Sequence, residues 1–376
     1  MKKRNSLNNN HLLADSFAPF TDWLERTGES PPYFDALPYQ PGLPPLLRFL
    51  DGAPVASEDD WRRRREEILR LLRHYILGSS PTDPPPLLDA EVEAEAREHA
   101  ATRRMVRLRF GTDPEVSFRI ELFLPDGAGP HPVLLTQGTH RAWALAALSR
   151  RFIGCVYPGS DGMDASEAFA AAYPECDWAL MLRRAWLGCR VVDYLLTLPK
   201  VDPARIGITG HSRNGKQSLI AAAIDSRIGA VVSSSSGSGG ACPWRFSHAA
   251  LFAEEAAITT RREIPWFHPR LRFFVGREDR LPIDAHALPG LIAPRPCLFS
   301  IATNDICESA FPLEKAFVEA RKVYEFLEQP DGLAIRWRTG GHEQNADDIQ
   351  AYLDFFENAF GIREVPVSWE TSTRLL

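Results

Sequence analysis

The sequence lacks long apolar runs and long blocks of charge of one sign. None of its 376 residues form a stretch near the roughly 20 apolar residues that a membrane span needs. The basic start of the chain is not followed by an apolar core of signal-peptide length. Net charge is −6, and the one basic run, residues 62–65, is flanked by acids. We therefore expect neither a membrane nor a nucleic acid as a partner.

Closely spaced cysteines are also missing. The six cysteines are scattered without a C-x-x-C pair, at positions 155, 176, 189, 242, 297 and 307. In a chain of this length they are typical of reduced core residues in a cytoplasmic protein. A periplasmic or secreted protein whose leader had been removed would look the same, so that location stays open. Internal repeats and low-complexity arrays are absent too.

What is present is enough apolar sequence for a sizeable core, since 44% of the residues are hydrophobic. Residues 1–55 are rich in proline, asparagine and glycine, which predicts an extended N-terminal arm lying over the rest. Ser57, followed by acids, begins a helical pattern that runs to Gly78. Residues 56–376 are predicted to form one catalytic domain.

Strand patterns and helix patterns alternate along that domain. The first strands, 92–98, 105–110 and 116–124, are separated by short turns and should be antiparallel. Later apolar runs alternate with helices, which indicates an α/β fold with a mostly parallel sheet covered on both faces. Residues 238–295 are too long for an ordinary crossover and are expected to form an insertion over the site. Residues 141–175 are the other candidate wall of the pocket.

The most informative segment is 205–216, which predicts a buried strand, a tight turn presenting Ser212, and the start of a helix. Such a nucleophile elbow places a serine hydroxyl above the positive end of a helix. Gly210 and Gly215 permit the close backbone approach that the turn needs. The common pattern is G-x-S-x-G, and here Asn214 occupies the second glycine position.

Two later residues complete a possible catalytic triad. An α/β-hydrolase supplies serine, then an acid, then histidine, each after a strand. Asp305 follows the apolar run 296–302, and His342 follows the alternating run 333–338. A histidine can take the serine proton, and a carboxylate fixes the histidine tautomer. Glu308, three residues after Asp305, remains an alternative for the acid.

A backbone donor for the oxyanion that forms during catalysis is expected from the turn that follows the strand at 132–136. In this fold that turn carries the second backbone donor of the oxyanion hole. Gly138 and Thr139 are the candidates for this donor.

Several segments resemble those of the glucuronoyl esterases, carbohydrate esterase family 15. The run Gly210-His-Ser-Arg-Asn-Gly-Lys216 is similar to the family's G-C-S-R-N-G-K elbow. The glycine-rich run 237–240, followed by Trp244-Arg245, resembles the segment after the family's next strand. Further segments shared with bacterial members and with related putative acetylxylan esterases are 265–267, 281–286 and 291–296. The resemblance extends from about Trp61 to about Phe360.

The resemblance implies roles for two residues of the elbow. Arg213 would contribute its guanidinium and its backbone N–H to the oxyanion site, and Lys216 would reach substrate hydroxyls. Bulky and charged residues of the insertion are expected to line the acid side of the pocket, namely Trp244, Arg245, Glu263 and Trp266.

The chain also departs from the family at three positions. The family's catalytic Glu matches Ser235, which cannot act as the acid, so the acid is expected after the following strand. A Trp that packs against the uronate ring in the family matches Cys307. The elbow Cys, often disulfide-bonded in fungal members, is His211.

These observations predict a serine carboxylic ester hydrolase that forms an acyl-enzyme and needs no metal or other cofactor. The expected substrate is a small-molecule or oligosaccharide ester, glucuronoyl or acetyl. A lactone hydrolase or peptidase on the same sheet, and a non-catalytic protein of this fold, are the alternatives. The sequence leaves the oligomeric state open.

Overall fold

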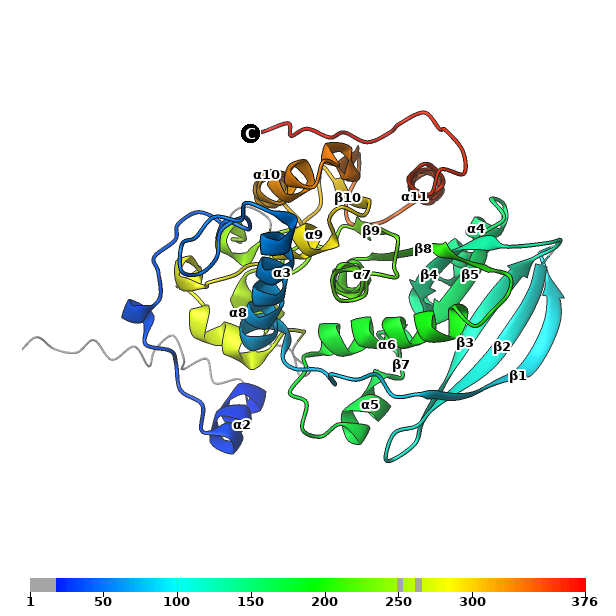
Figure 1. The fold of residues 1–376 in the computed structure, drawn as a ribbon, viewed down its shortest axis with the longest axis horizontal. Helices are drawn as coiled ribbons and strands as arrows, with labels where there is room; N and C mark the ends of the chain where they lie inside the picture. Colours follow the sequence, from blue (N-terminus) through cyan, green and yellow to red (C-terminus); the bar gives the residue numbers. More distant parts are fainter. Residues whose placement is uncertain (1–17, 100, 249–252, 261–265) are drawn as a thin grey trace, which may run out of the picture.

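The computed structural model describes residues 18–99, 101–248, 253–260 and 266–376, which form a nine-stranded sheet with helices on both faces (Figure 1). The strand order is β1-β2-β3-β5-β4-β8-β9-β10-β11. From β5 onward neighbouring strands are parallel, whereas β1, β2, β3 and β5 pair antiparallel. The strands are β1 (Leu87–Glu98), β2 (Ala101–Phe110), β3 (Val116–Pro125), β4 (His131–Gln137), β5 (Ile153–Tyr157), β8 (Val201–His211), β9 (Ala230–Ser234), β10 (Cys297–Ala302) and β11 (Leu333–Arg338). The predicted mostly parallel α/β sheet and the antiparallel opening strands are confirmed.

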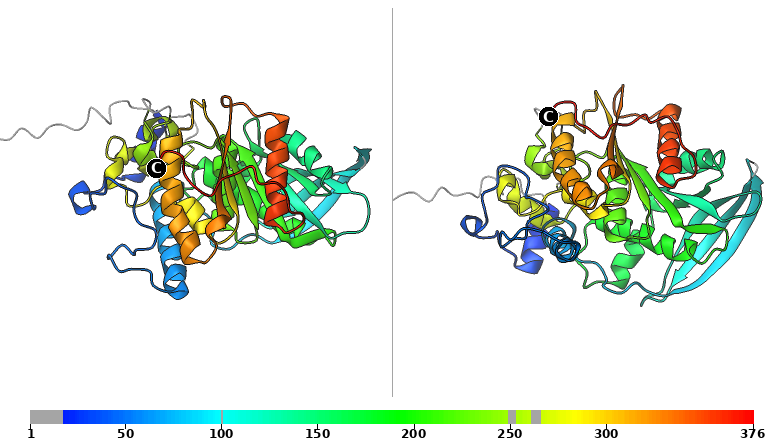
Figure 2. Two further views of the ribbon diagram at one scale, coloured as in Figure 1. Left: turned by 90° about the horizontal axis from the view of Figure 1, so that it is seen from above. Right: turned by 45° about the horizontal axis from the view of Figure 1, so that its top comes forward.

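Each face of the sheet has its own core. Helices α4 (Arg141–Leu148) and α11 (Ala346–Ala359) cover one face, where Trp143 and Phe356 are buried among strand residues. The opposite face carries the larger core, which includes residues of α6 (Leu180–Leu195), α7 (Arg213–Ile224), α9 (Ala287–Ile292) and α10 (Ala310–Phe326). The views in Figures 1 and 2 show α11 and α7 on opposite sides of the strands.

The predicted helix after the arm is confirmed as α3 (Glu58–Leu72), which continues into a π-helical turn, η2 (Arg73–Leu77). Ser57 accepts a hydrogen bond from the backbone N–H of Asp60, and three acids occupy the first turn. Gly78 ends the helix with a φ of 79°, a conformation that favours glycine.

The antiparallel strands form a wing whose outer strand β1 is exposed along most of its length. Ion pairs join β1 to β2 and to its surroundings, among them Arg104–Glu95 (2.7 Å), Arg109–Asp89 (2.9 Å) and Arg97–Asp126 (2.7 Å). An exposed strand edge invites pairing with other chains, and charged side chains are a common protection.

The other edge of the sheet, β11, is covered by the C-terminal tail. Ile335 and Glu370 exchange two backbone hydrogen bonds of 2.8 and 2.7 Å. Beyond this pair, the buried carboxylate of Glu314 accepts hydrogen bonds from the backbone N–H groups of Arg374 and Leu375. The tail therefore covers the β11 edge of the sheet, next to β10 and to the loop after β10 that carries Asp305, which we call the acid loop.

The N-terminal arm differs from the extended segment expected, because it contains the helix α2 (Ala18–Thr27). Phe20 and Trp23 on this helix are buried against Phe273, with ring centroids 5.7 and 6.0 Å apart. The ten-residue segment of α2 contains too few apolar residues for its periodicity to identify the helix from sequence.

The described residues of the insertion at 238–295 include the short helices η4 (Trp244–Phe246), α8 (Ala256–Thr259), η6 (Pro269–Phe274), η7 (Glu278–Arg280) and α9. All six cysteines are unpaired, and four of them are buried. Within the described residues, every helix is too short or too polar to span a membrane.

Candidate active site

Ser212 lies in the sharp turn between β8 and α7. Its φ of 56° and ψ of −124° place a non-glycine residue in a strained conformation of about 1–3 kcal/mol. The Ser212 N–H donates to Ser234 O at 2.8 Å, which ties the turn to β9. A Cβ on Gly210 would lie 2.4 Å from Asn214 O, so glycine is required there. The turn has the geometry of a nucleophile elbow.

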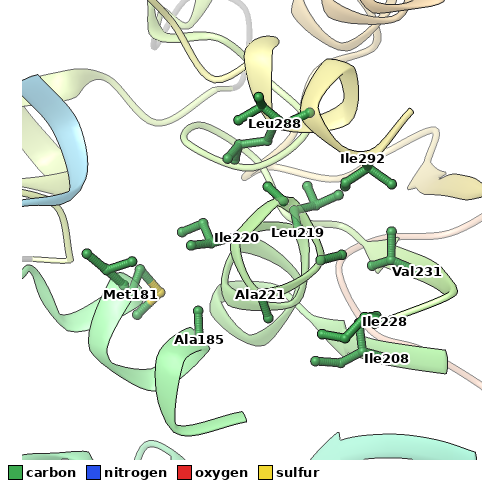
Figure 3. Close-up of a cluster of buried hydrophobic side chains, with 14 of the residues drawn as sticks. Met181, Ala185, Ile208, Leu219, Ile220, Ala221, Ile228, Val231, Leu288 and Ile292 are labelled. Atoms are coloured by element: carbon green, nitrogen blue, oxygen red, sulfur yellow. The ribbon is translucent and has the colours of Figure 1, made fainter. Parts of the chain in front are cut away.

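The helix below the elbow is held on several sides. Figure 3 shows Leu219, Ile220 and Ala221 of α7 among side chains from α6, α9 and the neighbouring strands. All three are fully buried. Because close-packed interiors have low compressibility, α7 provides a rigid base for Ser212.

His342 and Asp305 meet at the carboxyl ends of β11 and β10. The Nδ1 atom of His342 lies 2.9 Å from Oδ2 and 3.1 Å from Oδ1 of Asp305. The Asp305 side chain is fully buried, whereas 30% of the His342 side chain is exposed. Burial opposes ionisation of Asp305, but hydrogen bonds from His342, the Cys307 backbone and Ser235 outweigh it and hold the pKa of Asp305 below its usual value.

The elbow and the histidine loop are in contact through a second histidine. The ring of His211, the residue before Ser212, lies 4.5 Å from the ring of His342. Burial, followed by the nearby His342, lowers the pKa of His211 to about 3, so this ring is neutral near pH 7. In the described part of the chain, Ser212 Oγ makes no hydrogen bond to His342. Such bonds are often long in structures without substrate.

The glutamate considered as an alternative acid has a different environment. Glu308 Oε1 accepts the Gly237 N–H at 3.0 Å, and Oε2 has no hydrogen-bond partner among the described residues. Burial, with the charge of Asp305 adding to it, raises the pKa of Glu308 to about 8. Glu308 is therefore largely protonated at neutral pH, and the carboxylate that His342 contacts is that of Asp305.

The buried side chain of Arg338 is linked to Asp305 through Ser235. Arg338, at the end of β11, donates to Ser235 Oγ at 2.8 Å and to the backbone oxygen of His342 at 3.3 Å. Ser235 has a φ of 40° and donates its own hydroxyl proton toward Asp305. Arg338, Ser235, Asp305 and His342 thus form one connected set of hydrogen bonds.

The turn expected to supply the second oxyanion donor is η3 (Gly138–His140), directly beside the elbow. Asn214 Nδ2 donates to Thr139 Oγ1 at 2.9 Å and lies 3.1 Å from His140 Nε2. The backbone N–H of His211 also points to His140 Nε2, at 3.3 Å. Burial lowers the pKa of His140 to about 4, which keeps its ring neutral and able to accept hydrogen bonds.

Arg213 lies between an acid and an aromatic ring. Its guanidinium forms an ion pair with Asp161 and sits 5.2 Å from the centre of the Trp266 ring. Asp161 also pairs with Arg184 at 2.9 Å, so the short hairpin β6 (Gly159–Ser160) to β7 (Met163–Asp164) is fixed near the elbow. About a third of the Arg213 side chain is exposed, which leaves it accessible to a substrate.

Lys216 is almost fully buried in the first turn of α7. Its Nζ donates to the backbone oxygens of Ser236 and Ser238 at 2.6 and 2.8 Å and pairs with Glu254 at 3.3 Å. All three N–H donors have partners, and they hold the glycine-rich segment after β9 against the elbow. Contact of Lys216 with substrate hydroxyls stays a prediction.

The four insertion residues expected to line the pocket have different positions. Trp244 is buried and donates from Nε1 to Thr259 at 3.0 Å, and Arg245 is buried against Asp284 and backbone oxygens. In this arrangement neither offers surface to a substrate. Trp266 faces Arg213 and Lys216, with centroid distances of 5.2 and 5.4 Å. Glu263 lies outside the described residues.

Sequence reasoning missed several residues that shape the site. Asp161 lies in the segment predicted as a wall of the pocket, His140 in the turn after the strand at 132–136, and Arg338 at the end of the run 333–338. Asn214 was noted as a departure from the elbow pattern, and this was the one signal that could have shown that its side chain has a bonding role. Each of them has a side-chain partner that is distant in sequence, so spacing alone could not identify them.

A parallel sheet carrying a strained serine elbow, with histidine and aspartate at the following strand ends, defines an α/β-hydrolase. The model of the family "Glucuronyl esterase, fungi" matches residues 111–328, more than half of the chain. The chain therefore belongs to the glucuronoyl esterase family, carbohydrate esterase family 15, a family of carboxylic ester hydrolases, and the predicted resemblance is confirmed.

Individual relatives agree with this assignment. The 4-O-methyl-glucuronoyl methylesterase of Schizophyllum commune is 29% identical over 335 residues, covering 85% of this chain and 82% of that protein. The enzyme of the same name from Hypocrea jecorina is 30% identical over 274 residues, covering 69% and 56%. A solved glucuronoyl esterase from Caldicellulosiruptor kristjansonii superimposes with a TM-score of 0.75 at 26% identity, covering 92% and 97% of the two chains.

Proposed function

We propose that this protein hydrolyses esters of carbohydrate uronic acids, with Ser212 as nucleophile, His342 as general base and Asp305 as the acid of the triad. The observation that carries the proposal is the His342–Asp305 pair, 2.9 Å apart, in contact with the elbow that presents Ser212. The names of the relatives, methylesterases of 4-O-methyl-glucuronoyl groups, supply the substrate class.

The reaction has two halves. His342 takes the proton of Ser212, and the serine oxygen attacks the ester carbonyl to give a tetrahedral oxyanion. The carbonyl re-forms as the alcohol leaves with the proton from His342, so Ser212 carries the acyl group. Water, deprotonated by His342, then attacks the acyl-enzyme and releases the uronic acid and free Ser212.

The oxyanion would be held by groups around the elbow. Arg213 supplies a guanidinium beside Ser212, and the η3 turn supplies backbone N–H groups from Gly138 and Thr139. A fixed donor at this position is worth roughly 10²–10³ in rate. Because Asp161 pairs with Arg213, the guanidinium is oriented before substrate arrives.

Acetyl esters are the second candidate substrate. Cys307 stands where the family has a Trp against the uronate ring, and this smaller side chain removes one flat wall for a sugar. A site with weaker contact to the uronate would discriminate less between uronate esters and simpler esters.

The test is hydrolysis of benzyl glucuronate beside an aryl acetate by the wild-type chain, Ser212→Ala and the exposed control Ser149→Ala. We expect benzyl glucuronate to be the better substrate, with a loss of roughly 10⁴-fold or more in Ser212→Ala and none in the control. Cleavage of acetate alone would move the assignment to a deacetylating esterase. Equal activity in Ser212→Ala would overturn the mechanism.

A further inference from the structure

The acid loop places a thiol beside the His342–Asp305 pair. Asp305, Cys307 and His342 each offer one ligand atom, and these atoms all lie within 4.8 Å of one another. Among the described residues, no other three His, Cys, Asp or Glu side chains come together in this way. The Cys307 N–H donates to Asp305 Oδ1 at 2.8 Å, which closes the turn that brings residues 305 and 307 together.

The three side chains are those that zinc prefers in proteins. Zinc binds Cys sulfur at about 2.3 Å, His nitrogen at about 2.0 Å and carboxylate oxygen at about 2.0 Å, in tetrahedral geometry. Ligand atoms around one zinc ion are then roughly 3.3–3.5 Å apart. Asp305 and His342 are already at 2.9–3.1 Å. The half-buried Cys307 thiol lies within 4.8 Å of both of these atoms, so it would have to approach them by no more than about 1.5 Å.

The surroundings leave this set open to a cation. Asp305 forms its only ion pair in the described chain with His342, so no arginine or lysine neutralises the carboxylate. Arg338 donates instead to Ser235 Oγ and to the backbone oxygens of His342 and Glu343, and its carboxylate neighbour at 3.9 Å is Asp348. The exposed part of His342 gives an entry path from solvent.

We propose that Asp305, Cys307 and His342 form an inhibitory site for Zn²⁺, with a water molecule as the fourth ligand. Binding releases the thiol proton of Cys307 to solvent and breaks no covalent bond between heavy atoms. The thiolate and the carboxylate together balance the charge of the ion. The site goes beyond the proposed esterase function, and metal binding at these residues does not depend on that function.

Zinc at this position would remove the general base through Nδ1, the ring nitrogen of His342 that faces Asp305. A zinc ion on Nδ1 displaces the proton there, and the ring proton is then carried by Nε2, which becomes a donor and cannot accept the Ser212 proton. Inhibition therefore arises at the triad without blocking the cleft, so kcat falls more than KM rises.

Binding is tested with Co²⁺, whose thiolate complexes absorb in the near ultraviolet, and with Zn²⁺ as competitor. The wild-type chain and Ser212→Ala should both show this absorption and lose it when Zn²⁺ is added. Cys307→Ser and Cys307→Ala should lack it. Cys176→Ser is the matched control, because Cys176 is the other half-buried thiol, and it should keep the absorption. Absence of the band in wild type, or its loss only in Cys176→Ser, would overturn the site.

Inhibition is measured separately, as Zn²⁺ titrations of esterase rate with recovery by EDTA. Replacing Cys307 should raise the inhibitory concentration at least about tenfold, in line with the loss expected for disrupted metal sites. Equal inhibition in wild type and both Cys307 variants would refute the proposal. If the protein cleaves no ester, the Co²⁺ measurement still decides the site, because it also uses the Ser212→Ala protein.

Discussion

At the residue scale, neutralising Asp305 should abolish most of the activity, whereas neutralising Glu308, three positions later, should change it little. Asp305→Asn removes the carboxylate that orients His342, and we expect kcat to fall on the order of 10⁴-fold. Glu308→Gln keeps the acceptor for Gly237 N–H and resembles the protonated side chain, so activity at neutral pH should stay within a fewfold. Ester hydrolysis by the two variants checks this. A larger loss in Glu308→Gln than in Asp305→Asn would reverse the assignment.

The same glutamate gives a dependence of stability on pH. Its pKa is raised from 4.5 to about 8 by folding, so between these values the folded state retains a proton that the unfolded state has lost. This contribution is fully present below about pH 4.5 and is lost as pH rises through about 8. Urea unfolding of wild type should therefore show a decrease in unfolding free energy over this range that is smaller in Glu308→Gln.

Arg338 and Ser235 are positioning residues for Asp305, and their replacement should move the acid limb of the pH profile. Without the Ser235 hydroxyl the pKa of Asp305 rises toward its usual value, so Ser235→Ala needs higher pH for full activity. We expect kcat/KM of Ser235→Ala to fall below that of wild type on the acid side of the profile and to match it at higher pH.

The matched control for this network lies on the same strand. Arg336 pairs with Asp348 at 2.7 Å and has no contact with Ser235 or the His342 backbone among the described hydrogen bonds. Arg338→Met should shift the pH profile as Ser235→Ala does, whereas Arg336→Met should leave it in place. Identical profiles for all three variants would show that the network has only a structural role.

At the element scale, the C-terminal tail covers the free edge of β11, the last strand of the sheet. It pairs with β11 through Glu370, satisfies the buried Glu314 carboxylate and provides a wall, Arg374 and Leu375, of a pocket that also contains Asp305 and Glu308. Removing it exposes one strand edge and leaves a buried acid without partners.

Deleting residues 370–376 should therefore lower the free energy of unfolding by about 1–3 kcal/mol or more, the usual effect of an unsatisfied buried polar group. Combining the deletion with Glu314→Gln should recover part of this loss, because the uncompensated charge is gone. Urea unfolding of both proteins measures the effect. An unchanged midpoint after deletion would show that the tail contributes no stability.

At the scale of the whole molecule, the sheet could be predicted because each of its strands is a short apolar or alternating run in the sequence. The runs at 132–136, 152–156, 296–302 and 333–338 are all apolar or alternating and all form strands in the expected order. The serine, acid and histidine positions followed from their places after those strands.

What the sequence did not show depends on contacts between distant segments. Burial of the Lys216, Trp244 and Arg245 side chains follows from the packing of the insertion against the elbow, and nothing in the sequence around them distinguishes them from exposed residues. The choice between Asp305 and Glu308 rests on which side chain the turn at 305–307 directs to His342. Helix α2 was missed because its stability comes from Phe273 in the insertion.

The charged wing of β1, β2 and β3 should unfold more readily in salt than the part of the sheet that carries the active site. Four strands separate β1 from the strand that carries the elbow. Besides the backbone ladder, β1 and β2 are joined by ion pairs at the surface, each worth only about 0.2–1 kcal/mol and weakened by salt. High ionic strength would loosen the outermost strand while the helix under Ser212 stays packed. Catalytic turnover and overall structure would then report different melting points, and a preparation could look partly unfolded while remaining fully competent.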